Sequence, residues 1–333
     1  MSQEMQFNSE VQEATDHLYK KIQNTVPEIE WPLMAPYIYE INKLKKEKDV
    51  TILAHNYQTP DIFYGVADIV GDSLGLAIDG AKVKTEKILM CGVHFMAETA
   101  KIMSPEKKII LPDMRAGCSL AESITGEDVR NLKKQNPGVP VVTYVNTTAD
   151  VKAETDICCT SANAVKIVES LNVNKVIFLP DEYLANYVST KTDVEIITWK
   201  GKCEVHEQFK ESDIHELRKR YPELEVVAHP ECPPEVISAS DFTGSTGAMI
   251  DYVKKTKVKN IFLVTECSMG DNIKAENPNI NFVKPCNLCP HMKRITLQSI
   301  LNSLKSDINY IEIDSNVISK ARNAIERMIA VGK

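Results

Sequence analysis

The segment VTILAHNYQ, which begins at Val50, decides the fold because its pattern returns twice later in the chain. VPVVTYVNTT begins at Val139 and LEVVAHPEC begins at Leu224. Each is a short aliphatic run that ends in polar and aromatic side chains, and such runs are typical of strands buried on both faces of a parallel sheet. The three segments therefore predict the first strand of three similar units.

Three more patterns follow each of these strands in the same order. They are a small polar cluster that opens a helix (GDSLGLAIDGAK, CTSANAVKIVES, GSTGAMIDYVKK), a buried strand that leads into a helix (KILMCGVHFMAETAKI, KVIFLPDEYLANYV, NIFLVTECSMGDNI), and a strand that leads to a cysteine (KIILPDMRAGC, VEIITWKGKC, INFVKPCNLC). The register is kept, since Cys118, Cys203 and Cys289 are separated by 85 and 86 residues. Each unit is therefore predicted to run strand, helix, strand, helix, strand, helix, strand.

We expect an α/β fold of three pseudo-threefold-related α/β/α (three-layer) repeats, whose short parallel sheets surround a central cleft. Ligands of such sheets bind beyond the carboxyl ends of the strands, where the polar residues of all three units lie. The expected domains are residues 1–122 (N-terminal helices and first repeat), 123–207 (second repeat), 208–291 (third repeat) and 292–333 (C-terminal helices that pack back on the repeats).

The N-terminal part is expected to hold one helix over about residues 8–24 and a second before Val50. Trp31-Pro32 and Ala35-Pro36 predict breaks between these two helices.

Composition limits the kind of partner. The 333 residues are 43% hydrophobic and carry a net charge of −7, which argues against a nucleic-acid surface and favours small molecules. The N-terminus resembles no signal peptide, and no apolar run reaches the roughly 18 residues of a membrane span. With nine cysteines in such a chain, we expect a cytoplasmic protein with reduced thiols, some of which bind metal.

The equivalent cysteines Cys118, Cys203 and Cys289 predict a metal centre. Three thiolates on one axis can hold a [4Fe-4S] cluster and leave one iron without a cysteine ligand, free to act as a Lewis acid. Zinc is the alternative, because the C-x-x-C pair of Cys286 and Cys289 is also a zinc-binding element. Only Cys289 keeps the repeat spacing, so Cys286 is expected to be a spectator or to form a reversible disulfide with a neighbouring thiol.

The other cysteines have no such register. Cys91, Cys158 and Cys159 lie in or beside apolar strands and are expected in the core. Cys232 and Cys267 are too isolated to form a second zinc-binding pair.

Polar residues at strand and helix ends are candidate substrate ligands. The second helices open at Ser73, Ser161, and Ser245 with Thr246, which predicts N-caps and anion sites for carboxylates or a phosphate. Residues two apart on a strand point to the same side, so the first strands should deliver three pairs: His55 with Tyr57, Tyr144 with Asn146, and His229 with Glu231. Among these, Glu231 and Tyr57 suit proton transfer, while the two histidines suit a carbonyl or carboxylate.

Ten motifs resemble, in this order, those of the bacterial and archaeal quinolinate synthases. They are AHNYQ, GDSLGLA, AGCSL, YVNTTADVKA, TSANAV, LPDEYL, GKCEVHEQF, HPECP, GSTGAM and CPHMKR, spread from about Pro36 to Leu304. The resemblance implies three α/β/α domains around a [4Fe-4S] cluster. It also implies condensation of iminosuccinate (iminoaspartate) with dihydroxyacetone phosphate to quinolinate, the pyridine precursor of NAD, with loss of phosphate and water.

Carried over by position, the resemblance implies roles for individual residues. The implied cluster ligands are Cys118, Cys203 and Cys289, and the implied catalytic residues are Tyr57, Glu231 and His229. The implied substrate-binding residues are His55, Ser73, Tyr144, Asn146, Ser161, His229, Glu231 and Thr246. Some members carry C-x-x-C-x-x-C in the last motif, but this chain has Val283 at its first position and so departs from any regulatory disulfide of those members.

The resemblance also implies L-aspartate oxidase as the supplier of iminosuccinate, and a monomer or homodimer. Two other functions fit the same residues. One is a hydro-lyase with a similar three-cysteine cluster that acts on another hydroxy acid, and the other is a zinc-stabilised module that binds an anionic metabolite without turning it over.

Overall fold

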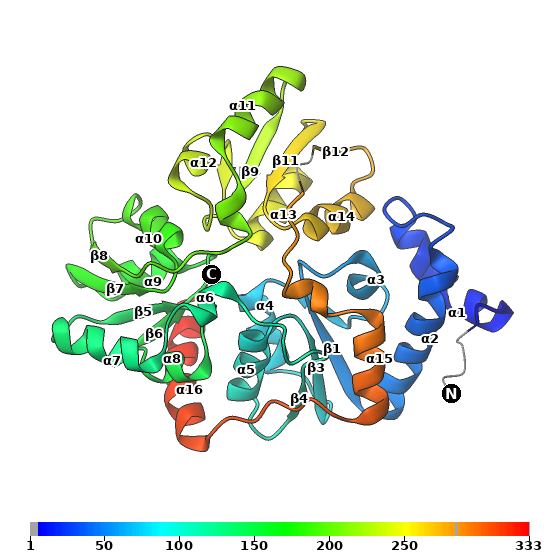
Figure 1. Cartoon of the computed structure of the whole chain (residues 1–333), viewed down its shortest axis with the longest axis horizontal. Helices are drawn as coiled ribbons and strands as arrows, with labels where there is room; N and C mark the ends of the chain where they lie inside the picture. Colours follow the sequence, from blue (N-terminus) through cyan, green and yellow to red (C-terminus); the bar gives the residue numbers. More distant parts are fainter. Residues whose placement is uncertain (1–5, 284–285, 333) are drawn as a thin grey trace.

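The computed structural model describes residues 6–283 and 286–332, and three short parallel sheets of four strands dominate this part of the chain. In each sheet the strands lie in the order second, first, third, fourth along the chain, and helices connect them (Figure 1). The protein is therefore α/β, with sheets and helices in the arrangement of a three-layer α/β/α fold. Every unit follows the predicted alternation of strands and helices.

The first sheet follows the N-terminal helices. Its strands are β1 (Val50–His55), β2 (Ile69–Gly71), β3 (Lys87–Cys91) and β4 (Lys108–Ile110). Its helices are α3 (Pro60–Phe63), α4 (Ser73–Gly80) and α5 (His94–Met103). Buried β-strands with no polar interior residue, such as β3, are what a sheet covered on both faces requires.

The second sheet follows α6 (Ser119–Glu122) and α7 (Gly126–Gln135). Its strands are β5 (Val141–Tyr144), β6 (Ile157–Cys159), β7 (Lys175–Leu179) and β8 (Glu195–Thr198), joined by α8 (Ala149–Ala153), α9 (Ala164–Ser170) and α10 (Glu182–Ser189).

The third sheet follows the 3₁₀ turn η1 (His206–Gln208) and α11 (Glu211–Arg220). Its strands are β9 (Glu225–Ala228), β10 (Phe242–Thr243), β11 (Asn260–Val264) and β12 (Asn281–Phe282), joined by α12 (Pro234–Ser238), α13 (Thr246–Lys255) and α14 (Cys267–Glu276). The 3₁₀ turn η2 (Met292–Arg294) comes after Cys289.

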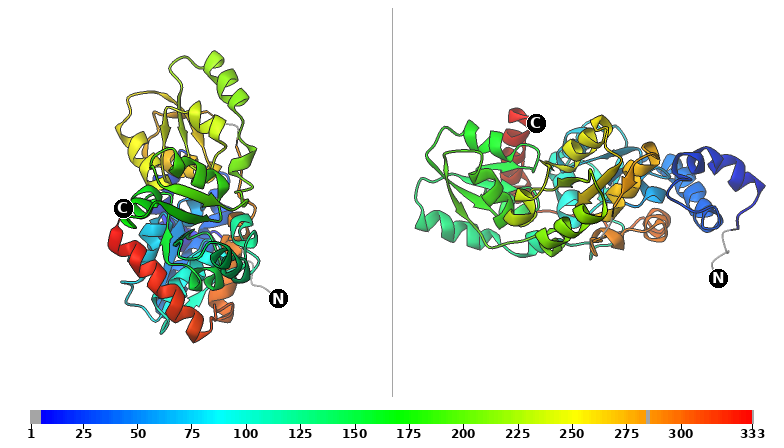
Figure 2. Two further views of the ribbon diagram at one scale, coloured as in Figure 1. Left: turned by 90° about the vertical axis from the view of Figure 1, so that its left-hand side faces the viewer. Right: turned by 90° about the horizontal axis from the view of Figure 1, so that it is seen from above.

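Helices at the two ends of the chain pack outside the sheets. The N-terminal pair is α1 (Ser9–Ile22) and α2 (Trp31–Glu47), and the C-terminal pair is α15 (Leu297–Ser306) and α16 (Ser315–Val331). α15 packs on α2, and α16 packs on α8 and β6 (Figure 1). Seen from above, α1 lies at the end of the molecule opposite the second sheet (Figure 2).

The predicted break at Ala35-Pro36 is wrong, because α2 continues through it. Pro32 lies in the first turn, where a backbone N–H has no acceptor within the helix and its loss costs little. Pro36 removes one helical hydrogen bond, but it is buried together with Trp31 and Ile38, and this packing holds the helix together.

Strand register explains why polar residues from distant segments meet. His55 at the end of β1 lies opposite Gly71 at the end of β2, so the loop that follows β1 emerges beside the start of α4. The other two sheets repeat this at Tyr144 opposite Cys159 and at Ala228 opposite Thr243. In each sheet the first strand and the start of the second helix therefore open at the same edge.

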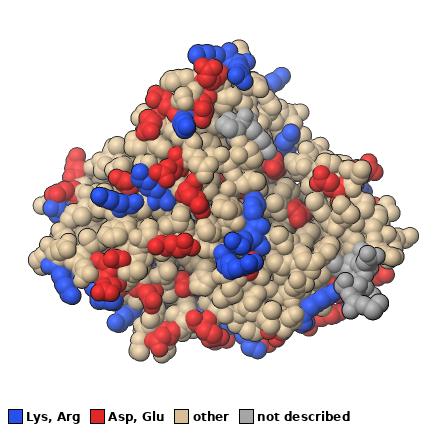
Figure 3. Space-filling model, in the orientation of Figure 1, with Lys and Arg blue, Asp and Glu red and all other residues tan. Residues whose placement is uncertain are grey.

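No helix in the described ranges is long and apolar enough to cross a membrane. On the face shown in Figure 3, acidic and basic side chains are interspersed rather than gathered by sign.

Candidate active site and metal centre

The carboxyl ends of the strands surround one cavity of about 70 Å³. Its lining includes all twelve residues to which the family resemblance gives a role in substrate binding, catalysis or the metal centre. These are His55, Tyr57, Ser73, Cys118, Tyr144, Asn146, Ser161, Cys203, His229, Glu231, Thr246 and Cys289. Ser245, the other predicted helix-start residue, does not line this cavity. Among the described residues that line this cavity there is no lysine or arginine.

His55 and His229 are held as neutral imidazoles. In both, Nδ1 accepts a backbone N–H from two residues later, at 3.2 Å from Tyr57 and 3.4 Å from Glu231. Burial lowers the pKa of His55 to about 4 and that of His229 to about 3. With Nδ1 occupied as an acceptor, the proton of each ring lies on Nε2, which in His229 is 3.2 Å from the Ser161 hydroxyl. The two imidazoles are thus suited to donate hydrogen bonds to an anion without carrying charge.

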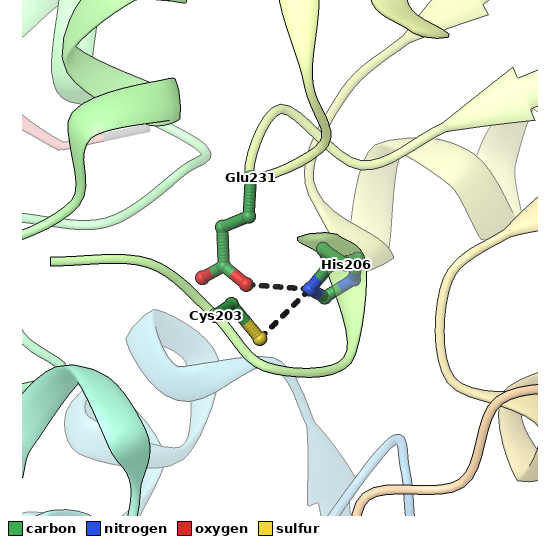
Figure 4. Close-up of side chains that lie close together, drawn as sticks. All are labelled: Cys203, His206 and Glu231. Atoms are coloured by element: carbon green, nitrogen blue, oxygen red, sulfur yellow. Dashed lines mark hydrogen bonds and ion pairs between the residues drawn. The ribbon is translucent and has the colours of Figure 1, made fainter. Parts of the chain in front are cut away.

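Glu231 is a fully enclosed carboxylate with several polar neighbours. Its Oε2 lies 2.8 Å from Nδ1 of His206 (Figure 4). Nδ2 of Asn146 donates to its Oε1 at 3.4 Å. Burial raises the pKa of Glu231, but His229, His206 and a hydrogen bond with Tyr144 together bring it below its ordinary value. The carboxylate is therefore held in its ionised form, which is the form that a general base requires.

A chain of hydrogen bonds connects Tyr57 to this carboxylate. The Tyr57 hydroxyl lies 2.6 Å from the Thr265 hydroxyl, which lies 3.0 Å from Nε2 of His206. The other ring nitrogen of His206 faces Glu231. Burial raises the pKa of Tyr57 well above its usual range, so the phenol stays protonated and a partner is needed to move its proton. Thr265 and His206 provide a continuous path between the two predicted proton-transfer groups.

The sequence did not predict His206 or Thr265. His206 is 1% exposed. It comes three residues after the predicted metal ligand Cys203, within GKCEVHEQF, and this proximity in sequence could have marked it as a site residue. Thr265 directly follows the buried strand β11, but nothing in its segment indicates that it faces Tyr57, which is 208 residues away.

The helix starts differ in detail from the prediction. Asp72, not Ser73, caps α4, since its Oδ1 accepts from Gly75 N at 2.7 Å. Ser161 lies in a turn before the start of α9. Ser245 caps α13 as predicted and leaves Thr246 as the first helical residue, whose hydroxyl accepts from Asn56 Nδ2 at 3.0 Å. Ser73, Ser161 and Thr246 line the cavity, whereas Ser245, the one predicted N-cap that the structure confirms, does not.

The three predicted metal-binding thiols lie in similar surroundings. Burial raises the pKa of all three, that of Cys118 to about 12, so they would resist ionisation without a cation. Backbone N–H groups two and three residues later donate to each sulfur and favour the thiolate. These donors are Leu120 and Ala121 for Cys118, Val205 and His206 for Cys203, and His291 and Met292 for Cys289. Partly buried thiols with such donors fit a metal centre.

Each cysteine loop is attached to its own unit by the same backbone hydrogen bond. The residue that begins the third helix donates to the carbonyl two residues before the cysteine. The three bonds are His94 N to Ala116 O (2.7 Å), Glu182 N to Gly201 O (2.8 Å) and Cys267 N to Asn287 O (3.1 Å). The backbone before each cysteine is therefore anchored to the start of the third helix of its unit.

A group of three donors also meets the geometry of a metal site. The ligand atoms of Cys203, His206 and Glu231 all lie within 4.8 Å of one another (Figure 4). The part of the chain described here thus holds a possible metal-binding group that includes one of the three predicted thiols.

The remaining cysteines follow the prediction with one exception. Cys91, Cys158 and Cys159 are fully buried in strands. Cys267, which looked isolated in sequence, is joined to Cys286 as a disulfide, with Cα atoms 5.3 Å apart. Of the two alternatives for Cys286, the structure has the disulfide, and the expectation of reduced thiols does not hold for this pair.

Comparison with known proteins identifies the family. The profile of the quinolinate synthetase A protein family matches residues 39–330. The chain is 56% identical over 326 residues to quinolinate synthase of Sinorhizobium medicae, covering 98% of this chain and 91% of that protein. It is 55% identical over 323 residues to quinolinate synthase 2 of Mesorhizobium japonicum, covering 97% and 100%. A match of this extent, together with a cavity that gathers all twelve predicted residues, shows that the chain belongs to the quinolinate synthetase A family.

Proposed function

We propose that this protein condenses iminosuccinate (iminoaspartate) with dihydroxyacetone phosphate to form quinolinate, with loss of phosphate and water, in NAD biosynthesis. The observation that carries the proposal is the single cavity in which neutral donors, an ionised carboxylate, a phenol and three thiols converge. The reaction needs each of them, because it combines anionic substrates, proton transfers and a dehydration.

The cofactor we propose is a [4Fe-4S] cluster held by Cys118, Cys203 and Cys289. Three partly buried thiols that each receive backbone N–H groups support this choice. The iron without a cysteine ligand would supply a Lewis acid for the dehydration. The remaining chemistry falls to the protein itself.

We assign substrate binding to the neutral donors around the cavity. His55 and His229 would donate from Nε2 to carboxylate or phosphate oxygens, and the hydroxyls of Ser73, Ser161 and Thr246 would add further donors from the helix starts. Tyr144 and Asn146, which face Glu231, would orient the second substrate.

Proton transfer is assigned to Tyr57 and Glu231, with His229 beside them. The hydroxyl of Thr265 and the ring of His206 lie between the phenol and the carboxylate, so a proton lost from one end can be replaced from the other. This arrangement supports general acid and base roles that exchange during the reaction.

We further propose that the three units are related by pseudo-threefold symmetry, with domains at 1–122, 123–207, 208–291 and 292–333. The common strand order and the three equivalent hydrogen bonds before the cysteines support it. The expected setting is the cytoplasm, with iminosuccinate supplied by L-aspartate oxidase and the chain acting as a monomer or homodimer.

The proposal is tested by purifying the chain without oxygen and measuring quinolinate formation from the two substrates. About four irons and four sulfides per chain, with broad absorbance near 400 nm, are expected alongside turnover. One zinc in a colourless, inactive protein would instead support the binding module. A cluster with no quinolinate, but with dehydration of another hydroxy acid, would support the hydro-lyase.

Glu231→Gln tests the proton-transfer assignment within that assay. The amide keeps the shape of the side chain but cannot take a proton, so kcat should fall by about 10²-fold or more while iron content is kept. Glu225→Gln, a change of the same kind at the partly buried first residue of β9, serves as the control. Full turnover of Glu231→Gln with an intact cluster would contradict the assignment.

A further inference from the structure

Lys293 joins three separate parts of the chain behind the cavity. It lies in η2, and its Nζ donates to the backbone carbonyl of Tyr57 at 2.8 Å and to the hydroxyl of Ser268 at 2.7 Å. The same Nζ lies 3.0 Å from Oε1 of Glu266, a carboxylate with no solvent exposure. One ammonium group thus contacts three partners, one in the loop that follows β1 and two at the start of α14.

The backbone around Tyr57 is held from the same side by α14. Nδ2 of Asn272 donates to the carbonyl of Asn56 at 3.1 Å and to that of Gln58 at 2.8 Å. Together with Lys293, it satisfies three consecutive carbonyls of a segment that follows β1. Two side chains thus hold the backbone of this short loop, and the loop carries a predicted catalytic residue.

The same corner also fixes the hydroxyl of Tyr57. Its partner Thr265 directly precedes Glu266, whose carboxylate caps α14 by accepting from Ser268 N at 2.8 Å. Tyr57 is therefore held at its backbone by Lys293 and at its hydroxyl by the residue next to the ion-pair partner of Lys293. Displacing the ammonium would loosen both ends.

The turn after the cysteine does not itself require a lysine. Lys293 N donates to the carbonyl of Cys289 at 3.1 Å, and Glu122 and Glu207 make the same bond to Cys118 and Cys203 at 3.0 and 2.9 Å. The turn forms equally well with glutamate at this position. The lysine side chain is then explained by what it contacts, namely the Tyr57 segment and Glu266.

We propose that Lys293 is a positioning residue that holds Tyr57 in place for proton transfer. The inference rests on the proposed function of Tyr57, but the contacts on which it depends are independent of the substrate. Lys293 does not line the cavity, so it acts through Tyr57 and not on the substrate.

The test compares Lys293→Met, Lys293→Arg and the double variant Lys293→Met/Glu266→Gln, which leaves no buried carboxylate unpaired. Lys293→Met should lower kcat at least about tenfold, with KM for both substrates within about threefold and iron content unchanged. Arginine should restore most of kcat, and the double variant should behave as Lys293→Met does. Lys254→Met is the control, since Lys254 also pairs with α14, through Glu276 at 3.4 Å, but on the surface.

Two measurements distinguish a positioning role of Lys293 from a general loss of protein stability. In a Tyr57→Phe background, adding Lys293→Met should lower kcat by less than about a further threefold, because the hydroxyl that Lys293 positions is already absent. Amide hydrogen exchange of residues 56–59 should become about tenfold faster in Lys293→Met and stay unchanged in Lys254→Met.

The inference is overturned if Lys293→Met keeps kcat within threefold of the original, or if it loses iron in proportion to activity. It is also overturned if Lys293→Met lowers kcat by the same factor in the Tyr57→Phe background as in the original chain. If the unsubstituted chain makes no quinolinate, the proposed function fails, while hydrogen exchange still decides whether Lys293 orders the Tyr57 segment.

Discussion

Replacing Thr265 with valine removes one hydroxyl from the path between Tyr57 and Glu231. Thr265 is 2% exposed, and its Oγ1 contacts the Tyr57 hydroxyl at 2.6 Å and His206 Nε2 at 3.0 Å. Valine has nearly the same shape, so the cavity wall is kept while the two polar partners lose their common neighbour. Burial already raises the pKa of Tyr57 and the hydrogen bond from Thr265 opposes it, so the substitution raises that pKa further.

The magnitude follows from the two lost bonds. Each contributes about 1 kcal/mol net, so the free energy of unfolding should fall by about 2 kcal/mol. General acid and base groups contribute about 10²–10⁴-fold to rate, and Thr265 works through Tyr57, so kcat should fall by about 10²-fold. KM should change little, because Thr265 does not line the cavity.

The measurement is steady-state quinolinate formation by cluster-loaded protein, with urea unfolding of the same samples. Thr143→Val is the matched control, because Thr143 is also fully buried and its hydroxyl lies 2.8 Å from that of Thr155, away from the cavity. The free energy of unfolding of Thr143→Val should fall by about 1 kcal/mol, and its kcat should be unchanged. A Thr265→Val enzyme with kcat within threefold of the original and normal iron content would refute the path.

Three more outcomes are expected. Serine at any one of the three cavity cysteines should reduce iron and sulfide to background, whereas Cys158→Ser should leave them unchanged. Because burial lowers the pKa of His55 from 6.5 to about 4, only the unfolded chain gains this proton as the pH falls below 6.5. The free energy of unfolding should therefore fall as the pH is lowered from 7.5 to 5, and this one histidine should account for about 2 kcal/mol of the fall. His55→Asn should lose about 2 kcal/mol less stability over the same pH range, measured by urea unfolding at pH 7.5 and 5. Burial raises the pKa of Glu98, and the charge of Lys152 opposes this shift. Lys152→Met leaves the buried carboxyl without this compensating charge, so the free energy of unfolding should fall by about 3 kcal/mol. Lys152→Met/Glu98→Gln removes the carboxyl as well and should recover most of that loss.

Regular patterns in the sequence predicted the parts of the fold that depend on local chemistry. Apolar runs that end in polar residues predicted the strands and the edge at which they open, and the spacing of the cysteines singled out Cys289 rather than Cys286. These features were accessible because period and spacing are properties of a single segment.

Contacts between distant segments could not be predicted in this way. Thr265 meets Tyr57 across 208 residues, and Lys293 meets it across 236. Pro36 stays inside a helix because of what packs on it, and Cys267 pairs with Cys286 because the loop before Cys289 is attached to α14. Each of these depends on how segments that are not adjacent in the chain pack in three dimensions, and the pattern within one segment does not specify that packing.

The lack of lysine and arginine among the described residues of the cavity lining has a consequence for recognition. Ion pairs weaken as salt rises, whereas hydrogen bonds from enclosed neutral groups are screened much less. Affinity for anionic substrates should therefore stay nearly constant with ionic strength. The choice between substrates then depends on where the carboxylate or phosphate oxygens of each molecule lie relative to fixed hydrogen-bond donors. The site therefore distinguishes molecules of equal charge by their shape.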